Sequence, residues 1–341
     1  MKESIDIKET PILQQFPGLL ELLLIDHTMT EKRRAETGNP DATANIFWAT
    51  DIYQKNGVGY GFYDEITPER ITGSFEGMVK PRSVKSREEQ LIRTRDKAEV
   101  FTPSWICNAQ NNLVDDAWFG RKDVFNAEYT DDEGRHLWRP IEGKIAFPDE
   151  KGKSWKDYVR DTRLEITCGE APYLVSRYDT TTGEPLELSQ RIGLLDRKLR
   201  VVSENTDDSK DFLDWAQVAY KNTYGYEWQG DSILLARENL LYTFLDYYVA
   251  KFGKRPVLTS IKYIAYIVSW NIWQMDGIKM VVPGSCESVF ETNLFGECTQ
   301  KECIACKQGD IRGHIGVSCK VRDWRKKDKK KQKITFASLL N

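Results

Sequence analysis

The alternation of helix-like and strand-like segments in the second half of the chain is the feature that most constrains its fold. Residues 209–220 carry apolar side chains at helical spacing, among them Phe212 and Ala216. Further helical segments lie at 232–252 and 260–268, and strand-like or mixed segments precede each of them. Because alternating helices and strands usually pack as helices on a sheet, this half predicts an α/β fold.

The first half of the chain is less regular. Residues 1–36 have a helical pattern, whereas 45–82 alternates aromatic residues with glycines and predicts short strands and turns. The highly charged segment 84–98 and the segment 104–118 are the next helix candidates. The polar stretch 126–154 is rich in turn residues and predicts a loop or insertion.

We therefore expect three regions: an N-terminal helical and β-rich extension (1–95), an α/β domain (96–283), and a cysteine-containing module with a basic tail (284–341). The tail carries seven basic residues in the nine positions 325–333, although the whole chain of 341 residues has a net charge of −3. Any contact with nucleic acid would therefore depend on a local patch and not on overall charge.

Composition and targeting signals point to a cytoplasmic protein without a membrane span. Hydrophobic residues make up 40% of the chain and charged residues 30%, which fits a soluble globular protein. The apolar run at 19–25 is too short to cross a bilayer, and no signal peptide is visible. The seven cysteines are an odd number without an export signal, which is typical of a reducing compartment.

The segment around Phe101 predicts the start of a helix. Thr102 is able to cap a helix that begins near Pro103, and proline is tolerated in a first helical turn. Free backbone groups at such a start are able to meet a ligand, although an ordinary helix start has the same pattern.

Residues 165–174 predict a turn that follows a strand. They read Glu-Ile-Thr-Cys-Gly-Glu-Ala-Pro-Tyr-Leu, so Glu165 precedes a turn at Cys168 and Gly169. In α/β sheets, ligands bind at the carboxyl ends of the strands. Glycine lets the backbone approach a ligand closely, and a carboxylate is able to bind an ammonium group by a charge-assisted hydrogen bond. A structural turn without a ligand is the alternative.

Two more acidic residues stand where strands are expected to end. Glu227 precedes the long helical segment, and Asp276 is followed by Gly277, which predicts a turn. In dinucleotide folds an acid at this position of the second strand binds ribose hydroxyls. Glu227 also fits a surface acid before an ordinary helix.

Together these segments resemble the adenine-N6 DNA methyltransferases of bacterial restriction–modification systems, over roughly residues 95 to 283. Residues 101–103 are similar to the family's F-T-P element, and 165–174 to its D-P-A-C-G-S-G-x-F-L loop. Residues 224–240 resemble the Y-G-x-E stretch that ends in L-A-R-x-N-L, and 269–278 resemble N-I-x-x-x-D-x-L. Two departures from the loop are Ala171 for the second glycine and Glu170 for a small residue.

The resemblance implies a doubly wound, Rossmann-like methyltransferase sheet that binds S-adenosylmethionine. Glu165 would bind the methionine ammonium group, Glu227 the ribose and Asp276 the adenine amino group, with Trp228 beside the adenine. The full set of implied cofactor contacts is Phe101, Thr102, Pro103, Glu165, Cys168, Gly169, Glu227 and Asp276. The implied partners are double-stranded DNA and a restriction or specificity subunit.

The family's catalytic Asn-Pro-Pro-Tyr or Asp-Pro-Pro-Tyr element is missing, because Asn-Pro occurs only at Asn39 and is followed by Asp41. Asp276 is then the best catalytic candidate, with Trp270 or Trp273 as an aromatic wall for a flipped base, although both tryptophans also fit a core. Two functions stay open. One is a methyltransferase-like enzyme directed at adenine N6, and the other is a catalytically degenerate protein of that fold that acts as a DNA-binding or partner subunit.

Cysteines in the last region have the spacing of a zinc site. Cys298, Cys303, Cys306 and Cys319 combine one close pair with two more distant thiols, which suits a tetrahedral structural site. Cys286 and His314 are further candidates, and free core cysteines are the alternative.

Overall fold

The computed structural model describes residues 7–97, 99, 102–286, 289–292, 298–301, 303–310 and 312–340. Its helices are α1 (Glu9–Gln15), α2 (Leu19–Leu24), α3 (His27–Thr37), α4 (Pro68–Ile71), α5 (Arg87–Lys97), α6 (Ser104–Phe119), α7 (Trp155–Arg160), α8 (Leu194–Asn205), α9 (Ser209–Lys221), α10 (Gly230–Phe252), α11 (Leu258–Asn271) and α12 (Ile304–Gln308). Its strands are β1 (Asn126–Thr130), β2 (His136–Pro140), β3 (Arg163–Glu165), β4 (Thr223–Glu227), β5 (Ile272–Gln274), β6 (Val289–Thr292), β7 (Cys298–Lys301), β8 (Lys320–Arg322) and β9 (Lys333–Thr335).

A short parallel sheet in the order β3-β4-β5 confirms the predicted α/β class. Arg163 lies opposite Thr223, and Gly225 lies opposite Ile272. Helices α8 and α9 connect β3 to β4, and α10 and α11 connect β4 to β5. Both crossovers step in the same direction, which is the topology of one half of a dinucleotide-binding sheet.

The two faces of this sheet are covered by different parts of the chain. Ile272 and the neighbouring Cys168 pack into the main core with the crossover helices, whereas Tyr226 and Trp273 pack into a second core with Phe336 near the C-terminus. Right-handed crossovers in one direction place their helices on one face. The described strands therefore form a single winding. The doubly wound sheet that the resemblance implies goes beyond them, because the β8–β9 hairpin lies where a second winding would add helices.

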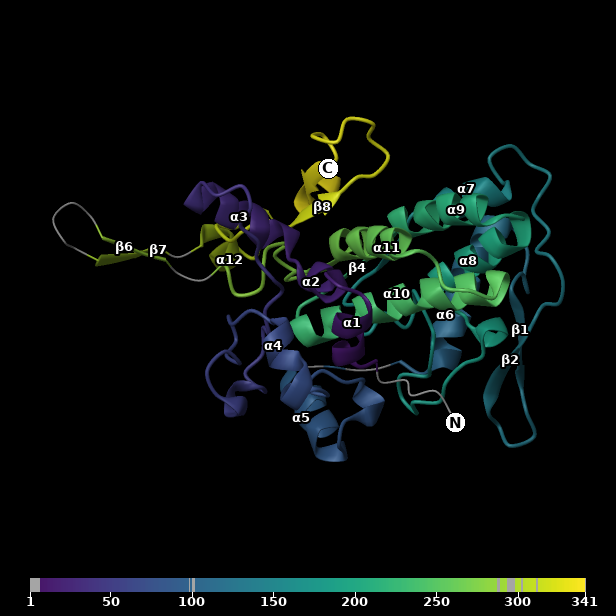
Figure 1. Ribbon diagram of the computed structural model, residues 1–341, viewed down its shortest axis with the longest axis horizontal. Helices are drawn as coiled ribbons and strands as arrows, with labels where there is room; N and C mark the ends of the chain where they lie inside the picture. Colours follow the sequence, from purple (N-terminus) through teal and green to yellow (C-terminus); the bar gives the residue numbers. More distant parts are fainter. Residues whose placement is uncertain are drawn as a thin grey trace.

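Helix α10 runs through the main core between α8 and α11 (Figure 1). Residues 230–241 are all buried, as expected of a helix enclosed on every side. Inside it, the guanidinium of Arg237 donates to the carbonyl oxygens of Ile272 (2.9 Å), Ser269 (3.0 Å) and Ile25 (3.0 Å). The arginine of the L-A-R-x-N-L stretch thus ties the start of β5 to the N-terminal extension.

The N-terminal extension contains fewer strands than its pattern predicts. Between 45 and 82 the described residues form turns, α4, short 3-10 segments and isolated bridges such as Phe47 with Glu65. Gly57 and Gly59 have φ values of 103° and 94°, which break an extended backbone. The helices predicted at 84–98 and 104–118 are confirmed as α5 and α6.

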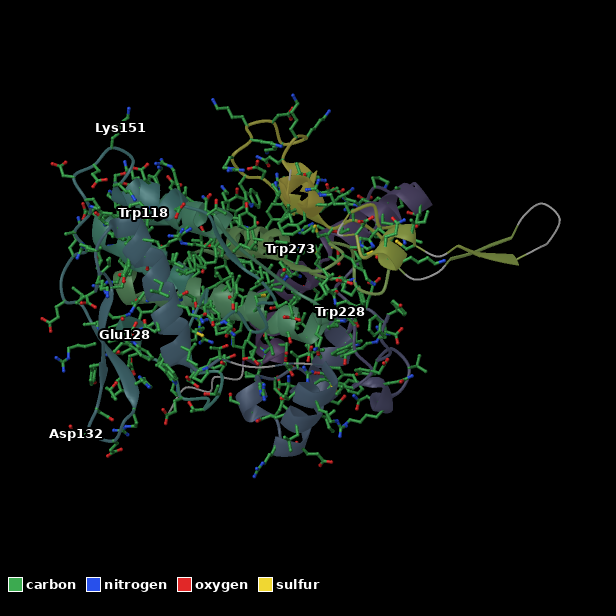
Figure 2. All side chains as sticks on the ribbon, turned by 180° about the vertical axis from the view of Figure 1, so that it is seen from behind. Trp118, Glu128, Asp132, Lys151, Trp228 and Trp273 are labelled. Atoms are coloured by element: carbon green, nitrogen blue, oxygen red, sulfur yellow. The ribbon has the colours of Figure 1, made fainter. Side chains whose placement is uncertain are left out.

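Two hairpins project from opposite ends of the molecule, β1–β2 at one end and β6–β7 at the other (Figure 1). Asp132 at the turn of β1–β2 points outward, whereas Trp273 lies inside the body (Figure 2). The stretch 126–154, predicted as a loop, thus includes a hairpin, and its first strand is largely exposed and polar. Among the described helices, none has the length and apolar character needed to span a membrane.

Candidate functional site

The loop that follows β3 turns back over the end of β4. Three of its residues have left-handed backbone conformations: Thr167 (φ 48°), Gly169 (φ 52°) and Ala171 (φ 65°). The Cys168 amide donates to the Tyr226 carbonyl (2.8 Å) and so holds the loop against β4. Such φ values exclude a helix here, which corrects the prediction that one follows the strand directly, since α8 begins only at Leu194.

Glu227, at the end of β4, is bonded to this loop. Its Oε2 atom accepts a hydrogen bond from the Gly169 amide (3.0 Å), and its Oε1 atom accepts one from the Trp228 amide (2.7 Å). Burial raises the pKa of Glu227, and these amides offset part of that effect. Two segments predicted to bind one cofactor therefore meet at adjacent strand ends.

Glu165, at the end of β3, is the buried carboxylate of this region. Its Oε1 atom accepts from the Tyr173 amide (3.4 Å), while its Oε2 atom is buried without a hydrogen-bond partner in the described part of the chain. Burial raises the pKa of Glu165 well above its usual range, and the negative charge of Glu227 adds to this. We call Glu165, Cys168, Gly169 and Glu227 the strand-end site.

The predicted helix start at Pro103 lies close to this site. Pro103 is the N-cap residue of α6 and precedes it in extended backbone. The Thr102 carbonyl accepts from the Cys107 thiol (3.6 Å), and the Thr102 side chain bonds Tyr173 from the loop. Thr102 does not cap α6; the carboxylate of Asp179 accepts from the first helical amide instead (2.7 Å). Phe101 lies outside the described residues.

Asp276 occupies a turn two residues beyond β5. Its Oδ1 atom accepts from the amides of Ile278 and Lys279, both at 3.0 Å. The structure thus gives this carboxylate a local turn-forming role.

The tryptophans proposed as an aromatic wall are core residues in this structure. Trp270 stacks on His27 with ring centroids 3.9 Å apart, and Trp273 packs against Phe336. Trp228 donates from its ring nitrogen to the Ala49 carbonyl (3.1 Å) and so joins the N-terminal extension to the strand-end site. Neither Trp270 nor Trp273 is placed to stack on a substrate base, which corrects that expectation.

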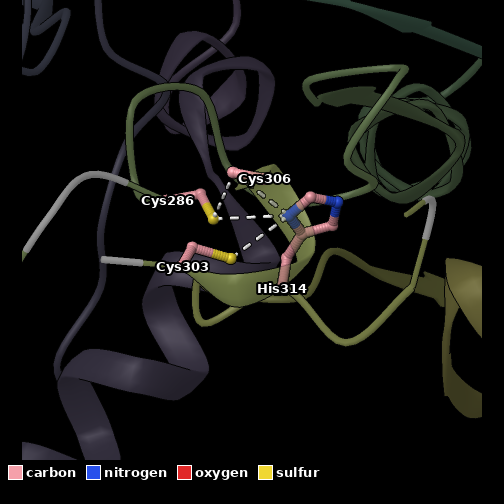
Figure 3. Close-up of side chains that lie close together, drawn as sticks. All are labelled: Cys286, Cys303, Cys306 and His314. Carbon is pink, nitrogen blue, oxygen red and sulfur yellow. Dashed lines mark hydrogen bonds between the residues drawn. The ribbon is translucent and has the colours of Figure 1, made fainter. Parts of the chain in front are cut away.

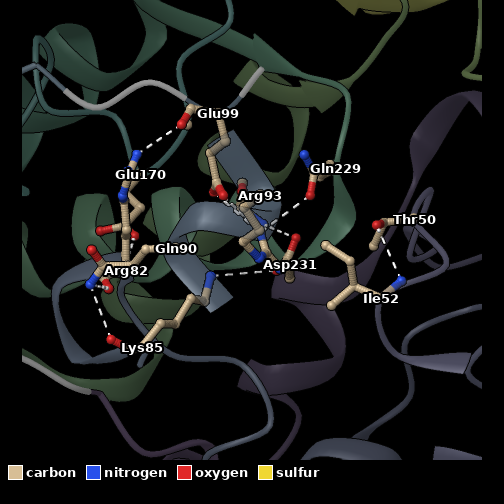
Figure 4. Close-up of polar contacts among 12 residues, drawn as sticks. Thr50, Ile52, Arg82, Lys85, Gln90, Arg93, Glu99, Glu170, Gln229 and Asp231 are labelled. Carbon is tan, nitrogen blue, oxygen red and sulfur yellow. Dashed lines mark hydrogen bonds and ion pairs between the residues drawn. The ribbon is translucent and has the colours of Figure 1, made fainter. Parts of the chain in front are cut away.

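A buried ionic network that sequence reasoning missed lies at the start of α10, next to Glu227 (Figure 4). The guanidinium of Arg93 from α5 pairs with Asp231 and donates to Gln229 (3.2 Å) and Glu99 (3.2 Å). The ammonium of Lys85 lies 3.8 Å from the Asp231 carboxylate. Burial raises the pKa of Asp231, but the charges of Arg93 and Lys85 outweigh it and hold that pKa at about 2.

Glu170, one of the departures from the family's loop, holds the segment before α5 on the loop. Its carboxylate accepts from the Arg82 amide (2.7 Å) and from the Tyr178 hydroxyl (2.6 Å). Asn239 from α10 donates to the Glu170 carbonyl (3.2 Å). A small residue at this position would lose both carboxylate contacts, so the departure itself was the available signal for this packing.

A second candidate site gathers Cys286, Cys303, Cys306 and His314, which we call the metal-binding group (Figure 3). Their ligand atoms all lie within 4.8 Å of one another. The Nδ1 atom of His314 is 3.4 Å from the Cys306 sulfur, 3.5 Å from that of Cys286 and 3.6 Å from that of Cys303. The sulfurs of Cys286 and Cys306 are 3.6 Å apart.

These separations match a tetrahedral ion. Zinc bonds of about 2.3 Å to sulfur and 2.0–2.1 Å to nitrogen require S···S separations of roughly 3.8 Å and S···N separations of roughly 3.5–3.6 Å. Backbone amides of Cys306 and Ile315 lower the pKa of Cys303 to about 6, which favours the thiolate. Burial and the neighbouring thiols raise the pKa of Cys306 to about 11.

The metal-binding group shares two residues with the predicted zinc set. Cys303 and Cys306 belong to both, whereas the side chain of Cys298 lies outside the described residues. Cys319 is buried in the second core and donates to the Gln274 carbonyl (3.4 Å), so it is not part of the group. The two further candidates, Cys286 and His314, take the remaining positions.

No family model matches this sequence, and no curated protein or solved structure matches it.

Proposed function

We propose that the chain is an S-adenosylmethionine-binding, DNA methyltransferase-like protein of a restriction–modification system, directed at adenine N6. The observation that carries this proposal is the buried, unpartnered Oε2 atom of Glu165 beside a loop whose Gly169 amide meets Glu227. Buried carboxylate oxygens are normally satisfied, so an unpartnered one is a reason to look for a cationic ligand. The ammonium group of S-adenosylmethionine would supply a charge-assisted hydrogen bond.

The residues at the two strand ends then divide the cofactor between them. Glu165 binds the ammonium group, Gly169 lets the backbone approach, and Glu227 accepts from the ribose hydroxyls. Bound S-adenosylmethionine would supply an activated methyl group for transfer to the base.

Isothermal titration calorimetry with S-adenosylmethionine tests this arrangement. Glu165→Gln and Glu227→Gln should each weaken binding about ten-fold or more, because a hydrogen bond to a charged group contributes about 1.5–3 kcal/mol. Glu150→Gln, on the exposed surface, is the matched control. Equal affinities in all four proteins would rule the site out.

The catalytically degenerate alternative has its own supporting observation. The Oδ1 atom of Asp276 is bonded to two amides of its own turn, and the sequence contains no Asn-Pro-Pro-Tyr element. On this alternative the chain binds DNA or cofactor as a partner subunit, and methylation depends on another protein. Tritiated methyl transfer to mixed-sequence DNA by the purified chain separates the two: robust transfer that Asp276→Asn abolishes supports the enzyme, and no transfer supports the subunit.

For the metal-binding group we propose one structural Zn²⁺ ion. Four protein ligands leave no open position for a substrate, and closed four-ligand sites are structural. Metal analysis of protein purified without added zinc should give one zinc per chain. Cys286→Ser should lose the metal, whereas Cys319→Ser should retain it. Zinc loss in the second variant and not the first would exchange their roles and contradict the assignment.

A further inference from the structure

Strand β3 lies at the open edge of the parallel sheet. The Arg163 amide donates to the Asn222 carbonyl (3.0 Å), so alternate residues of this strand face β4. By the same alternation, the backbone groups of Leu164 and Ile166 face away from the sheet. The side chain positions agree with an open edge, since Leu164 is 43% exposed and Ile166 is 64% exposed.

One face of the same strand is also uncovered. A groove of about 220 Å³ runs between β3 and the C-terminal segment. Its apolar lining is formed by Leu164, Tyr224, Trp273, Ile334, Phe336 and Leu339. Parallel sheets are normally covered on both faces, and strand edges are normally paired or protected. An occupant that covers both the edge and the face must be an extended polypeptide, because a small ligand would fill only the groove.

We propose that this occupant is the edge strand of a second copy of the chain, paired antiparallel about a two-fold axis at Leu164. The Leu164 amide of each copy then donates to the Leu164 carbonyl of the other, and the Ile166 amide donates to the Thr162 carbonyl. The result is one continuous sheet of six strands. An interface of this kind is self-complementary, as a two-fold dimer requires.

The sequence of the edge favours its own copy as partner. In the proposed register, Arg163 of one copy lies opposite Glu165 of the other, so like charges do not face each other across the new pair. On the groove face, Leu164 meets Leu164 and Ile166 meets Thr162, which places the exposed apolar side chains side by side. This inference does not depend on cofactor binding or on catalysis.

Sedimentation velocity over low to high micromolar protein tests the dimer. The wild-type mass should rise from 39.4 kDa toward twice that value. Leu164→Lys and Leu164→Asp should each stay monomeric, because either places two like charges together at the axis. An equimolar mixture of these two variants should recover the dimer mass. Leu113→Lys is the control, since Leu113 is an exposed apolar residue on α6.

Disulfide trapping places the axis independently of charge. Directly paired residues of antiparallel strands have Cα atoms about 5.5 Å apart, within the range that a disulfide spans. Mild oxidation should therefore link Leu164→Cys chains in pairs, and Leu113→Cys chains far less. A monomer at all concentrations would overturn the proposal. A dimer that Leu164→Lys leaves intact would do so as well, because it would place the interface elsewhere.

Discussion

The strand-end site and the metal-binding group differ in what their side chains bind within the chain. At the strand ends, both oxygens of Glu227 accept from backbone amides, and only the Oε2 atom of Glu165 lacks a partner in the described part of the chain. In the metal-binding group, three sulfurs and the Nδ1 atom of His314 face one another at the spacing of a coordination shell. The first region is held mainly by its own hydrogen bonds, whereas the second requires an ion to hold its thiols together.

This difference predicts where the chain depends on an added component. Removing an ion from a site built around it leaves crowded thiols with little to replace the lost bonds. Removing a cofactor from the strand-end site leaves the loop, the buried ionic network and the two cores in place. Metal therefore belongs to folding here, and the cofactor belongs to activity.

The largest expected effect follows metal removal. Because structural zinc is associated with about 10–16 kcal/mol in small zinc-binding peptides, chelation should open the segment around the metal-binding group. Hydrogen exchange should show lost protection at 303–319 with α10 unchanged. In His314→Ala the segment should be open before chelator is added, so that chelation changes nothing further. Full protection after metal removal in the wild type would show that the segment folds without an ion.

The second effect concerns the ionic network beside the strand-end site. Asp231→Ala should lower the free energy of unfolding by about 3–5 kcal/mol, because it leaves Arg93 and Lys85 buried without their anion. Asp214→Ala, which removes an exposed pair with Lys210, should cost less than about 1 kcal/mol. Urea unfolding measures both, and equal losses would mean that the network does not hold the extension in place.

The same network should give an acid-dependent stability. The folded-state pKa of Asp231 lies at about 2, below its ordinary value of 3.8, so its contribution is present above pH 4 and is lost as pH falls toward 2. The wild type should therefore lose stability over that window more steeply than Asp231→Ala does.

Sequence reasoning reached the parallel strands and the acids at their ends because both follow from local patterns. Glu165 and Glu227 end their strands as expected, and the cysteine spacing found Cys303 and Cys306. It did not reach His314 as a ligand, because a lone histidine eight residues after Cys306 has no spacing signal that distinguishes it from a core residue. The β6–β7 hairpin between Cys286 and Cys303 separates two ligands that meet only in space.

The number of windings was also beyond local pattern. The chain leaves β5 for a turn at Asp276 and the metal-binding group, and β8 and β9 then cover the second sheet face. Apolar residues such as Val321 and Ile334 are the same types that a further helix would bury, so composition does not tell the two covers apart. The basic segment 325–333, predicted as part of a tail, is largely the loop between these two strands.

The smallest expected effect lies in that loop. Lys326, Lys327, Lys329, Lys330 and Lys331 are exposed. If the loop contacts duplex DNA through these five lysines, the log–log slope of affinity against salt should be about −4.5. Lys330→Gln should reduce the slope by about 0.9, and Lys210→Gln on α9 should not change it. Fluorescence anisotropy over a salt series measures this. An unchanged slope after removal of all five charges would place DNA contacts elsewhere.

The most direct test of the strand-end site is the proton balance of S-adenosylmethionine binding, measured by calorimetry in buffers of different ionisation enthalpy. Burial raises the pKa of Glu165 in the free protein, and an ammonium group beside the carboxylate should lower it again. Binding should therefore release protons from Glu165 at pH values below its raised pKa, and affinity should increase with pH through that range. Glu165→Gln should remove this release while Glu150→Gln retains it. Cofactor binding with the same proton balance in the wild type and Glu165→Gln, or no binding at all, would contradict the account.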